Sequence, residues 1–285
     1  MNATVEAVRK AFREADALLI TAGAGMGVDS GLPDFRGNEG FWKAYPPIAK
    51  LGYSFAEMAD PRWFDENPRL AWAFYGHRLN LYRRTVPHSG FEQLREAGRQ
   101  KAGGCFVFTS NVDGQFQRAG FAAEQLVECH GSIHHLQCTR GCSEEIWSAE
   151  GVSVAVDMER FEAVGELPRC PKCGALARPN ILMFGDWGWL PQRTEFQERR
   201  FERWLHRIVS EKMTLAVVEI GAGEAVPTVR RTSEAVVRES DGILIRINPR
   251  DTEVPRGHYA LACGALEGVG MLIPDVCDII EKQSK

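Results

Sequence analysis

Residues 17–27, ALLITAGAGMG, begin with an apolar run of strand length and end in closely spaced glycines. Three later stretches have the same form: GCFVFTSN (104–111), LAVVEIGAG (215–223) and GILIRINP (242–249). Apolar strands that alternate with helical segments predict a parallel sheet covered by helices on both faces. We therefore expect an α/β chain with a Rossmann-like parallel sheet.

The carboxyl ends of these expected strands carry small or polar residues. In parallel sheets, ligands bind at this edge. The residues concerned are Gly23–Gly27, Ser110–Asp113, Gly221–Gly223 and Asn248–Asp251. We expect them to surround one crevice.

The first glycine cluster departs from the usual dinucleotide fingerprint. Gly27 comes one position too early for G-x-G-x-x-G after Gly23 and Gly25, and no acidic residue follows about 20 residues later at a second strand end. From the glycines alone, a dinucleotide site and a merely tight turn both remain open.

Two stretches interrupt the alternation of strands and helices. Residues 41–86 are helix-like and rich in aromatic residues, and residues 131–180 carry four clustered cysteines around a polar middle. We expect these insertions to form a smaller domain with a helical module and a zinc module. The large Rossmann-like domain then comprises residues 1–40, 87–130 and 181–285.

The four clustered cysteines have the spacing of a zinc site. Cys138 and Cys142 are separated by three residues, and Cys170 and Cys173 by two. Four thiolates leave no open coordination position, so we expect one structural zinc ion rather than a catalytic one. The remaining cysteines are expected to be small core residues: Cys105, Cys129, Cys263 and Cys277.

Charge and hydropathy exclude several classes of partner. The net charge is −4 and the pI is about 6.0, which argues against a nucleic-acid-binding surface. The first residues lack the basic-then-apolar order of a signal peptide, and no apolar run approaches membrane-spanning length. We expect a cytoplasmic protein without a membrane partner; its oligomeric state is not predicted.

Longer motifs are far more specific than the glycines. GAGMGVDSGLPDFRG (23–37) resembles the cofactor-binding loop of the sirtuins, the NAD-dependent protein deacylases. TSNVD (109–113), the pair His130-Gly131, the four cysteines, RPNILMFGD (178–186) and the glycines at 221–223 follow in the family's order. The resemblance covers roughly residues 10–275.

The resemblance implies a reaction and the residues that perform it. An acyl-lysine protein or peptide would pass its acyl group to the ADP-ribose part of NAD+, with release of nicotinamide. His130 would be the general base, a role that suits a side chain titrating near neutral pH, and Asn111 would orient a ribose hydroxyl or a water. His134 and His135 are expected to be structural.

The resemblance also assigns binding residues. Those implied for NAD+ are Ala22, Gly23, Ala24, Gly25, Asp34, Phe35, Arg36, Ser110, Asn111, Val112, Asp113, Gly221, Ala222, Gly223, Asn248 and Cys263. Those implied for an extended substrate peptide are Met183, Phe184, Gly185 and Asp186. A peptide there would pair as an added strand.

A tyrosine and an arginine within one helix suggest an acyl preference. Tyr75 and Arg78 resemble the Tyr-x-x-Arg pair by which some sirtuins bind succinyl, malonyl or glutaryl groups. At this spacing the two side chains share a helix face and can bind a carboxylate together. The alternative is that Arg78 lies on a solvated face and Tyr75 in the core.

Several positions depart from the family pattern. Gly27 stands where serine is usual, Ser110 replaces a glutamine, the glycines at 221–223 replace G-T-S, and Trp187-Gly188-Trp189 follows Asp186. Because these changes concern the acceptor more than NAD+, two other functions remain open. They are a mono-ADP-ribosyltransferase or NAD glycohydrolase on the same scaffold, and a non-catalytic sensor of NAD or ADP-ribose.

Overall fold

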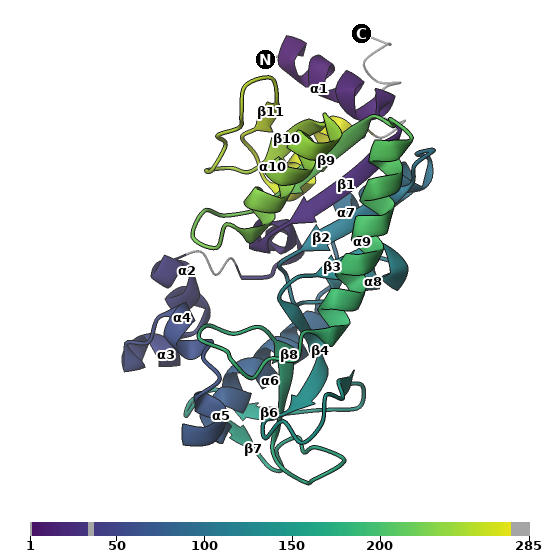
Figure 1. Ribbon diagram of the computed structural model, residues 1–285. Coiled ribbons are helices and arrows are strands. Elements are labelled where there is room, and N and C mark those ends of the chain that lie inside the picture. Colours follow the sequence, from purple (N-terminus) through teal and green to yellow (C-terminus); the bar gives the residue numbers. More distant parts are fainter. Residues whose placement is uncertain (1, 34–36, 275–285) are drawn as a thin grey trace.

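The computed structural model describes residues 2–33 and 37–274, and its larger part is built on a six-stranded sheet in the order β11-β10-β9-β1-β2-β3 (Figure 1). All neighbouring strands of this sheet are parallel, which confirms the expected sheet type. The strands are β1 (Ala17–Ala22), β2 (Cys105–Thr109), β3 (Leu126–Glu128), β9 (Leu215–Ile220), β10 (Ile243–Ile247) and β11 (Tyr259–Leu261).

The strand order reverses at β1, which creates the edge where ligands of such sheets bind. The register pairs Ala22, the last residue of β1, with Thr109 of β2 and Ile220 of β9. The segments that follow these three strands therefore begin side by side.

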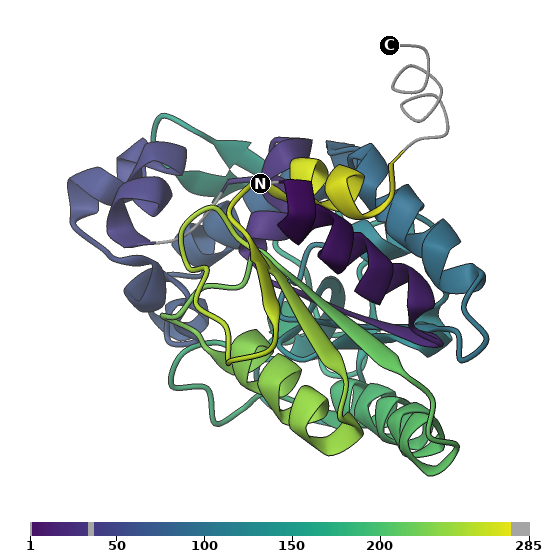
Figure 2. The ribbon, with the colours of Figure 1, turned by 90° about the horizontal axis from the view of Figure 1, so that it is seen from above.

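Helices cover both faces of the sheet (Figure 2). Along β1, Leu18 and Ile20 belong to one buried cluster, whereas Ala17 and Leu19 belong to another. This alternation follows from the two-residue period of a strand. The first cluster includes residues of α1 (Asn2–Glu14), α7 (Ser89–Arg99), α8 (Gln115–Arg118) and α11 (Ala265–Leu272), and the second includes residues of α9 (Gln192–Ser210) and α10 (Thr228–Ser240).

The two sequence insertions share a third hydrophobic cluster in the lower part of the molecule (Figure 1). There α6 packs against β6 and β7, and β4 pairs antiparallel with β5 and β8. The helices are α2 (Gly37–Ala44), α3 (Pro46–Leu51), α4 (Phe55–Met58), α5 (Trp63–Glu66) and α6 (Pro68–Arg84). The strands are β4 (Gly131–Cys138), β5 (Trp147–Ser148), β6 (Ala155–Asp157), β7 (Glu162–Val164) and β8 (Ala177–Ile181). Two short 3-10 helices, η1 (Ala24–Ser30) and η2 (Ala123–Gln125), lie in the larger part.

An ion pair is buried within the apolar sheet. Arg246 of β10 donates to both carboxylate oxygens of Glu219 on β9, at 2.5 and 3.1 Å, and also to Glu234 of α10. The Arg246 and Glu219 side chains are 1% and 0% exposed. Loss of Arg246 would leave the Glu219 carboxylate buried without its charged partner, at a cost of about 3–5 kcal/mol.

Three of the four cysteines expected in the core are buried: Cys105, Cys129 and Cys263. Cys277 lies outside the described residues. Within the described part of the chain, no helix combines the length and the apolar character needed to cross a membrane.

Candidate functional site

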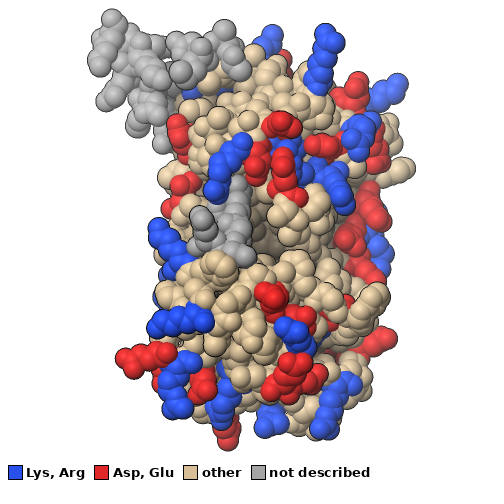
Figure 3. Space-filling view, turned by 90° about the vertical axis from the view of Figure 1, so that its left-hand side faces the viewer, with Lys and Arg blue, Asp and Glu red and all other residues tan. Residues whose placement is uncertain are grey.

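A cavity of about 850 Å³ opens where the carboxyl edge of the large sheet meets the helices and strands of the insertions. Figure 3 shows a hollow in the middle of one face of the molecule, with few charged side chains at its floor. The volume lies within the range of pockets for small molecules and cofactors.

Most of the predicted site residues line this cavity. They are Gly23, Ala24, Tyr75, Arg78, Ser110, Asn111, Val112, Asp113, His130, Met183, Phe184, Gly221, Ala222 and Gly223. Six others are described but do not line it: Ala22, Gly25, Gly185, Asp186, Asn248 and Cys263. Asp34, Phe35 and Arg36 lie outside the described residues.

The glycines after β1 and β9 pack directly against each other. The Gly23 N–H donates to the Ile220 carbonyl at 2.9 Å, and the Gly25 N–H to the Gly221 carbonyl at 3.0 Å. A Cβ on Gly23 would lie 2.7 Å from the Gly221 oxygen, closer than real Cβ atoms come. Glycine is therefore required here by the contact between two loops, whatever ligand the loops hold.

Asn111 is fixed by hydrogen bonds at the floor of the cavity. Its Nδ2 donates to the Gly23 carbonyl at 2.9 Å, and its backbone N–H donates to the Thr109 Oγ1 at 3.0 Å. Among the described residues, its Oδ1 has no donor. The side chain therefore presents an amide oxygen of fixed orientation to the cavity.

His130 lies in the turn between β3 and β4. Its backbone carbonyl accepts from the Leu182 N–H at 3.0 Å, while its ring makes no hydrogen bond to the described residues. Burial lowers the pKa of the imidazole below its ordinary value. At neutral pH the ring is therefore uncharged and can accept a proton from a bound group.

Gly131, the next residue, is held by contact with β8. Its φ is +76°, and a Cβ there would lie 2.1 Å from the Asn180 carbonyl oxygen. Gly151 has almost the same φ, +77°, but has open space around it. Substitutions at the two glycines therefore distinguish the energetic cost of the positive φ from the cost of the steric contact with β8.

We expect Gly131→Ala to destabilise the protein far more than Gly151→Ala. The αL conformation alone costs alanine about 1–2 kcal/mol, and overpacking against β8 adds roughly 1–3 kcal/mol at Gly131. Denaturant unfolding of both variants measures the difference. Equal loss of stability would contradict the close approach of β4 and β8.

Asp113 and His134 fix the segment after β2. His134 Nε2 lies 2.9 Å from the Asp113 carbonyl oxygen, and the Asp113 carboxylate accepts from the Gln115 N–H at 2.9 Å. Burial raises the pKa of Asp113 to about 6, with the nearby Glu128 charge acting in the same direction. His134 thus has the structural contact that the sequence led us to expect.

Tyr75 and Arg78 are both buried and both line the cavity, so the alternative of a solvated Arg78 is wrong. Arg78 Nε donates to Tyr82 Oη at 3.0 Å, and its guanidinium lies 5.0–5.9 Å from the ring centroids of four aromatic residues. Tyr75 Oη is buried without a partner among the described residues. Tyr82, a cavity residue that sequence analysis missed, follows Arg78 by one helical turn.

Asp186 is occupied by a structural contact instead of facing the cavity. Its carboxylate pairs with Arg178 at 2.8 Å, and both side chains are at most 4% exposed. It also accepts from the Met183 and Gly188 N–H groups at 3.3 and 3.0 Å. Asp186 therefore shapes the 183–188 loop that brings Met183 and Phe184 to the cavity.

Asn248, like Asp186, supports cavity residues without lining the cavity itself. Its Nδ2 donates to the Ala222 carbonyl at 2.8 Å, and its Oδ1 accepts from the N–H groups of Arg250 and Asp251. Those three residues line the cavity, although Asn248 itself is fully buried beneath them.

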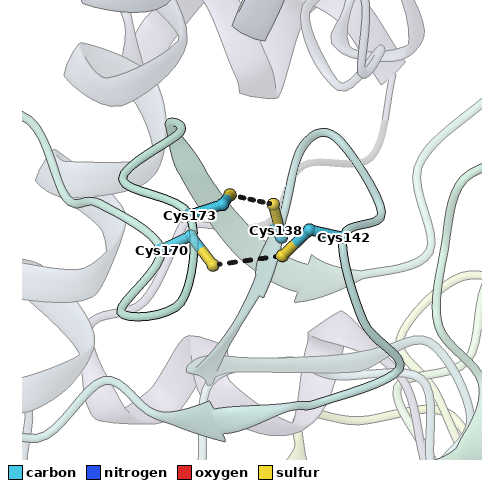
Figure 4. A group of neighbouring side chains, drawn as sticks. All are labelled: Cys138, Cys142, Cys170 and Cys173. Atoms are coloured by element: carbon cyan, nitrogen blue, oxygen red, sulfur yellow. Dashed lines mark hydrogen bonds between the residues drawn. The ribbon is translucent and has the colours of Figure 1, made fainter.

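The four clustered cysteines converge, as predicted from their spacing (Figure 4). Their Sγ atoms all lie within 4.8 Å of one another, with Cys138–Cys173 and Cys142–Cys170 both at 3.6 Å. Tetrahedral zinc with bonds of about 2.3 Å separates its sulfurs by roughly 3.8 Å. The donor set and its geometry thus fit a structural zinc ion.

Known proteins resemble this chain over most of its length. The model of the Sir2 family matches residues 23–205. An NAD-dependent protein deacylase of Thermus thermophilus is 31% identical over 277 residues, which cover 95% of this chain and 94% of the relative. One of Pyrococcus abyssi is 31% identical over 255 residues, 88% of each chain.

Solved structures agree with this similarity. The crystal structure of a Sir2 homologue in complex with NAD matches with a TM-score of 0.72 and 27% identity, over 96% of this chain and 94% of the other. A complex of mutant Sir2 homologues with 2'-O-acetyl ADP-ribose matches with the same TM-score and identity, over 96% and 97%. The family model covers more than half of the chain and its relatives cover nearly all of it, so this chain belongs to the Sir2 family.

Proposed function

We propose that the chain is an NAD-dependent protein lysine deacylase that transfers the acyl group to ADP-ribose and releases nicotinamide. The observation that carries the proposal is one cavity that holds both an uncharged, accessible histidine and a fixed asparagine oxygen. Relatives named NAD-dependent protein deacylases support it.

The cavity has groups that suit NAD+. Residues 224–226 line it just before the first turn of α10, and the first N–H groups of a helix lack intrahelical acceptors and favour phosphate. Asp113 is buried and lines the cavity with Val112, and we propose that the Asp113 side chain and the Val112 backbone hold the nicotinamide carboxamide. When bound, NAD+ supplies a ribose carbon that the acyl oxygen attacks as nicotinamide leaves.

His130 and Asn111 would then act on the ribose. His130 takes the proton of a ribose hydroxyl, which makes that oxygen a better nucleophile toward the acyl carbon. Asn111 orients the hydroxyl through its amide oxygen. Burial keeps the histidine neutral until this proton arrives.

The acylated substrate would enter beside Met183 and Phe184. Phe184 is 42% exposed, and its ring lies 6.1 Å from that of Phe55. Gly185 and the side chain of Asp186 support this loop from outside the cavity, and an extended peptide would pair with its backbone.

We also propose that the chain has two domains. The large domain comprises residues 1–40, 87–130 and 181–285, and the small domain comprises residues 41–86 and 131–180.

The test is incubation with acetyl- and succinyl-lysine peptides and NAD+. Loss of the acyl group with one nicotinamide released per turnover supports deacylation. ADP-ribose attached to protein, or free in solution without peptide, would instead indicate transferase or glycohydrolase activity. Binding of NAD+ without turnover on any acceptor would indicate a sensor.

We further propose that the acyl pocket prefers acidic acyl groups. Burial raises the pKa of Tyr75 above its ordinary value, so its unpartnered hydroxyl stays protonated and can donate to a carboxylate. The Arg78 guanidinium, in the same pocket, supplies the opposite charge.

We expect Arg78→Met to lower kcat/KM for a succinyl peptide by about 10- to 100-fold, because one charge-assisted hydrogen bond is worth about 1.5–3 kcal/mol. The rate with an acetyl peptide should change much less. Arg84→Met, an exposed position on the same helix, is the matched control. Equal losses on both peptides would remove the acidic-acyl preference and leave deacylation untouched.

A further inference from the structure

A second cavity, of about 460 Å³, lies between α8, β4 and α9. Two segments of the chain border both cavities. In the first, Asp113 lines the large cavity and Gly114 lines the second; in the other, His130 lines the large cavity and Ser132 lines the second. Figure 1 shows α9 running along this side of the molecule, next to β3 and α8. Nothing in the deacylation reaction described above uses this cavity.

The described residues that line this cavity include three arginines and no acid. The arginines are Arg118, Arg193 and Arg200, accompanied by His134 and His135. Glu128 does not line the cavity; its side chain is 1% exposed and pairs with Arg193, while its Oε1 is buried without a partner among the described residues. The described lining therefore carries three guanidinium groups and no carboxylate, which gives it a positive charge.

Three polar atoms of the lining are buried without a partner in the described part of the chain. They are Arg193 Nη1, Arg200 Nε and His135 Nδ1. The two arginine nitrogens can only donate hydrogen bonds, and a buried unsatisfied donor costs about 1–3 kcal/mol. All three atoms belong to side chains that line one cavity, and a hydrogen-bond acceptor held among these side chains would give the two arginine nitrogens a partner.

An aromatic ring stands at the rim. Phe196 is 52% exposed, and the Arg200 guanidinium lies 4.8 Å from its ring centroid. Arginine held against a ring keeps its N–H fork in a fixed plane, the geometry that matches phosphate and carboxylate oxygens.

We propose that this cavity is a binding site for the oxyanion group, phosphate or carboxylate, of a small metabolite, held by Arg118, Arg193 and Arg200. The exposed face of Phe196 provides an apolar contact for the rest of such a molecule. The site is separate from the proposed NAD+ cavity and does not depend on the deacylase proposal.

The experiment is titration with inorganic phosphate at constant ionic strength, followed by NMR of the histidine ring protons. His130 is a lining residue of the large cavity, whereas His134 and His135 are lining residues of the second. We expect saturable shifts of the His134 and His135 signals. Shifts confined to His130, or no saturable shift, would overturn the proposal.

Substitutions on α8 and α9 test whether the arginines bind the anion. Arg200→Gln and Arg118→Gln should each weaken phosphate binding by about tenfold or more, because each removes a charge-assisted hydrogen bond. Arg203→Gln is the matched control, since Arg203 is on the same helix as Arg200 but is exposed and does not line the cavity. Equal affinity in all three variants would contradict the site.

Acetate and benzoate, titrated in the same way, distinguish the source of the oxyanion. Tighter binding of phosphate than of either carboxylate assigns the site to a phosphate ester. Tighter binding of benzoate than of acetate and phosphate assigns the site to an aromatic carboxylate whose ring contacts Phe196. Failure of all three anions to shift His134 and His135 rejects the site.

Discussion

His130→Ala should lower the rate of acyl transfer by about 100- to 10,000-fold, the usual contribution of a general base. NAD+ affinity should stay near that of the wild type, because the imidazole ring makes no hydrogen bond that supports the described part of the cavity. Nicotinamide release measured with a peptide substrate, together with NAD+ titration by calorimetry, separates the two effects.

The matched control is His206→Ala on α9, because His206 is exposed and does not line the cavity. It should retain full activity. If His130→Ala kept most of the acyl transfer, the base would have to be another group; Asp113, whose pKa burial raises to about 6, also lines the cavity.

The pH profile provides an independent readout of the same residue. The base acts in its neutral form, and burial lowers the pKa of His130. Activity should therefore persist as the pH falls through about 6.5, the ordinary value for histidine, and decline only below it. The acidic limb of kcat/KM measures this value, and a limb above 6.5 would contradict a buried neutral His130.

Removal of one zinc ligand should have the second large effect. Cys170→Ser should abolish zinc binding and unfold the strands around the cysteines, because metal binding supplies much of the folding free energy of such modules, about 10 kcal/mol or more. Zinc content by mass spectrometry and the circular dichroism spectrum report the two consequences.

Cys105→Ala provides the comparison. Cys105 is buried on β2, outside the four-cysteine cluster, so its loss can lower stability but should leave one zinc ion per chain. A Cys170→Ser protein that kept both its zinc and its native spectrum would show that the cluster does not depend on four thiolates.

The sequence predicts well those features that depend on neighbouring residues or on fixed spacing. Apolar runs such as 17–22 specify buried strands, and their parallel arrangement then places Ser110–Asp113 and Gly221–Gly223 on either side of the residues that follow β1. The cysteine spacings likewise predict a cluster that the structure confirms. In each case one local pattern carries the information.

Contacts between distant segments were not predictable in this way. Asp186 looks like a substrate residue in the sequence, but its partner Arg178 lies across a turn and both side chains are buried. Arg246 breaks the pattern of an apolar strand, and only the pairing of β9 with β10 supplies its partner Glu219. The second cavity combines residues from three separate parts of the chain, so no single motif marks it.

Strand β4 joins the two sites that these experiments address. It begins directly after His130 and ends at Cys138, with an irregularity in its pairing to β8 between Ser132 and Leu136. One end of a single strand thus follows the proposed general base, and the other carries a zinc-site cysteine that oxidants can attack. We expect peroxide that strips the metal to inactivate the enzyme without modifying a residue that touches substrate, which would make catalysis sensitive to the redox state of the cell.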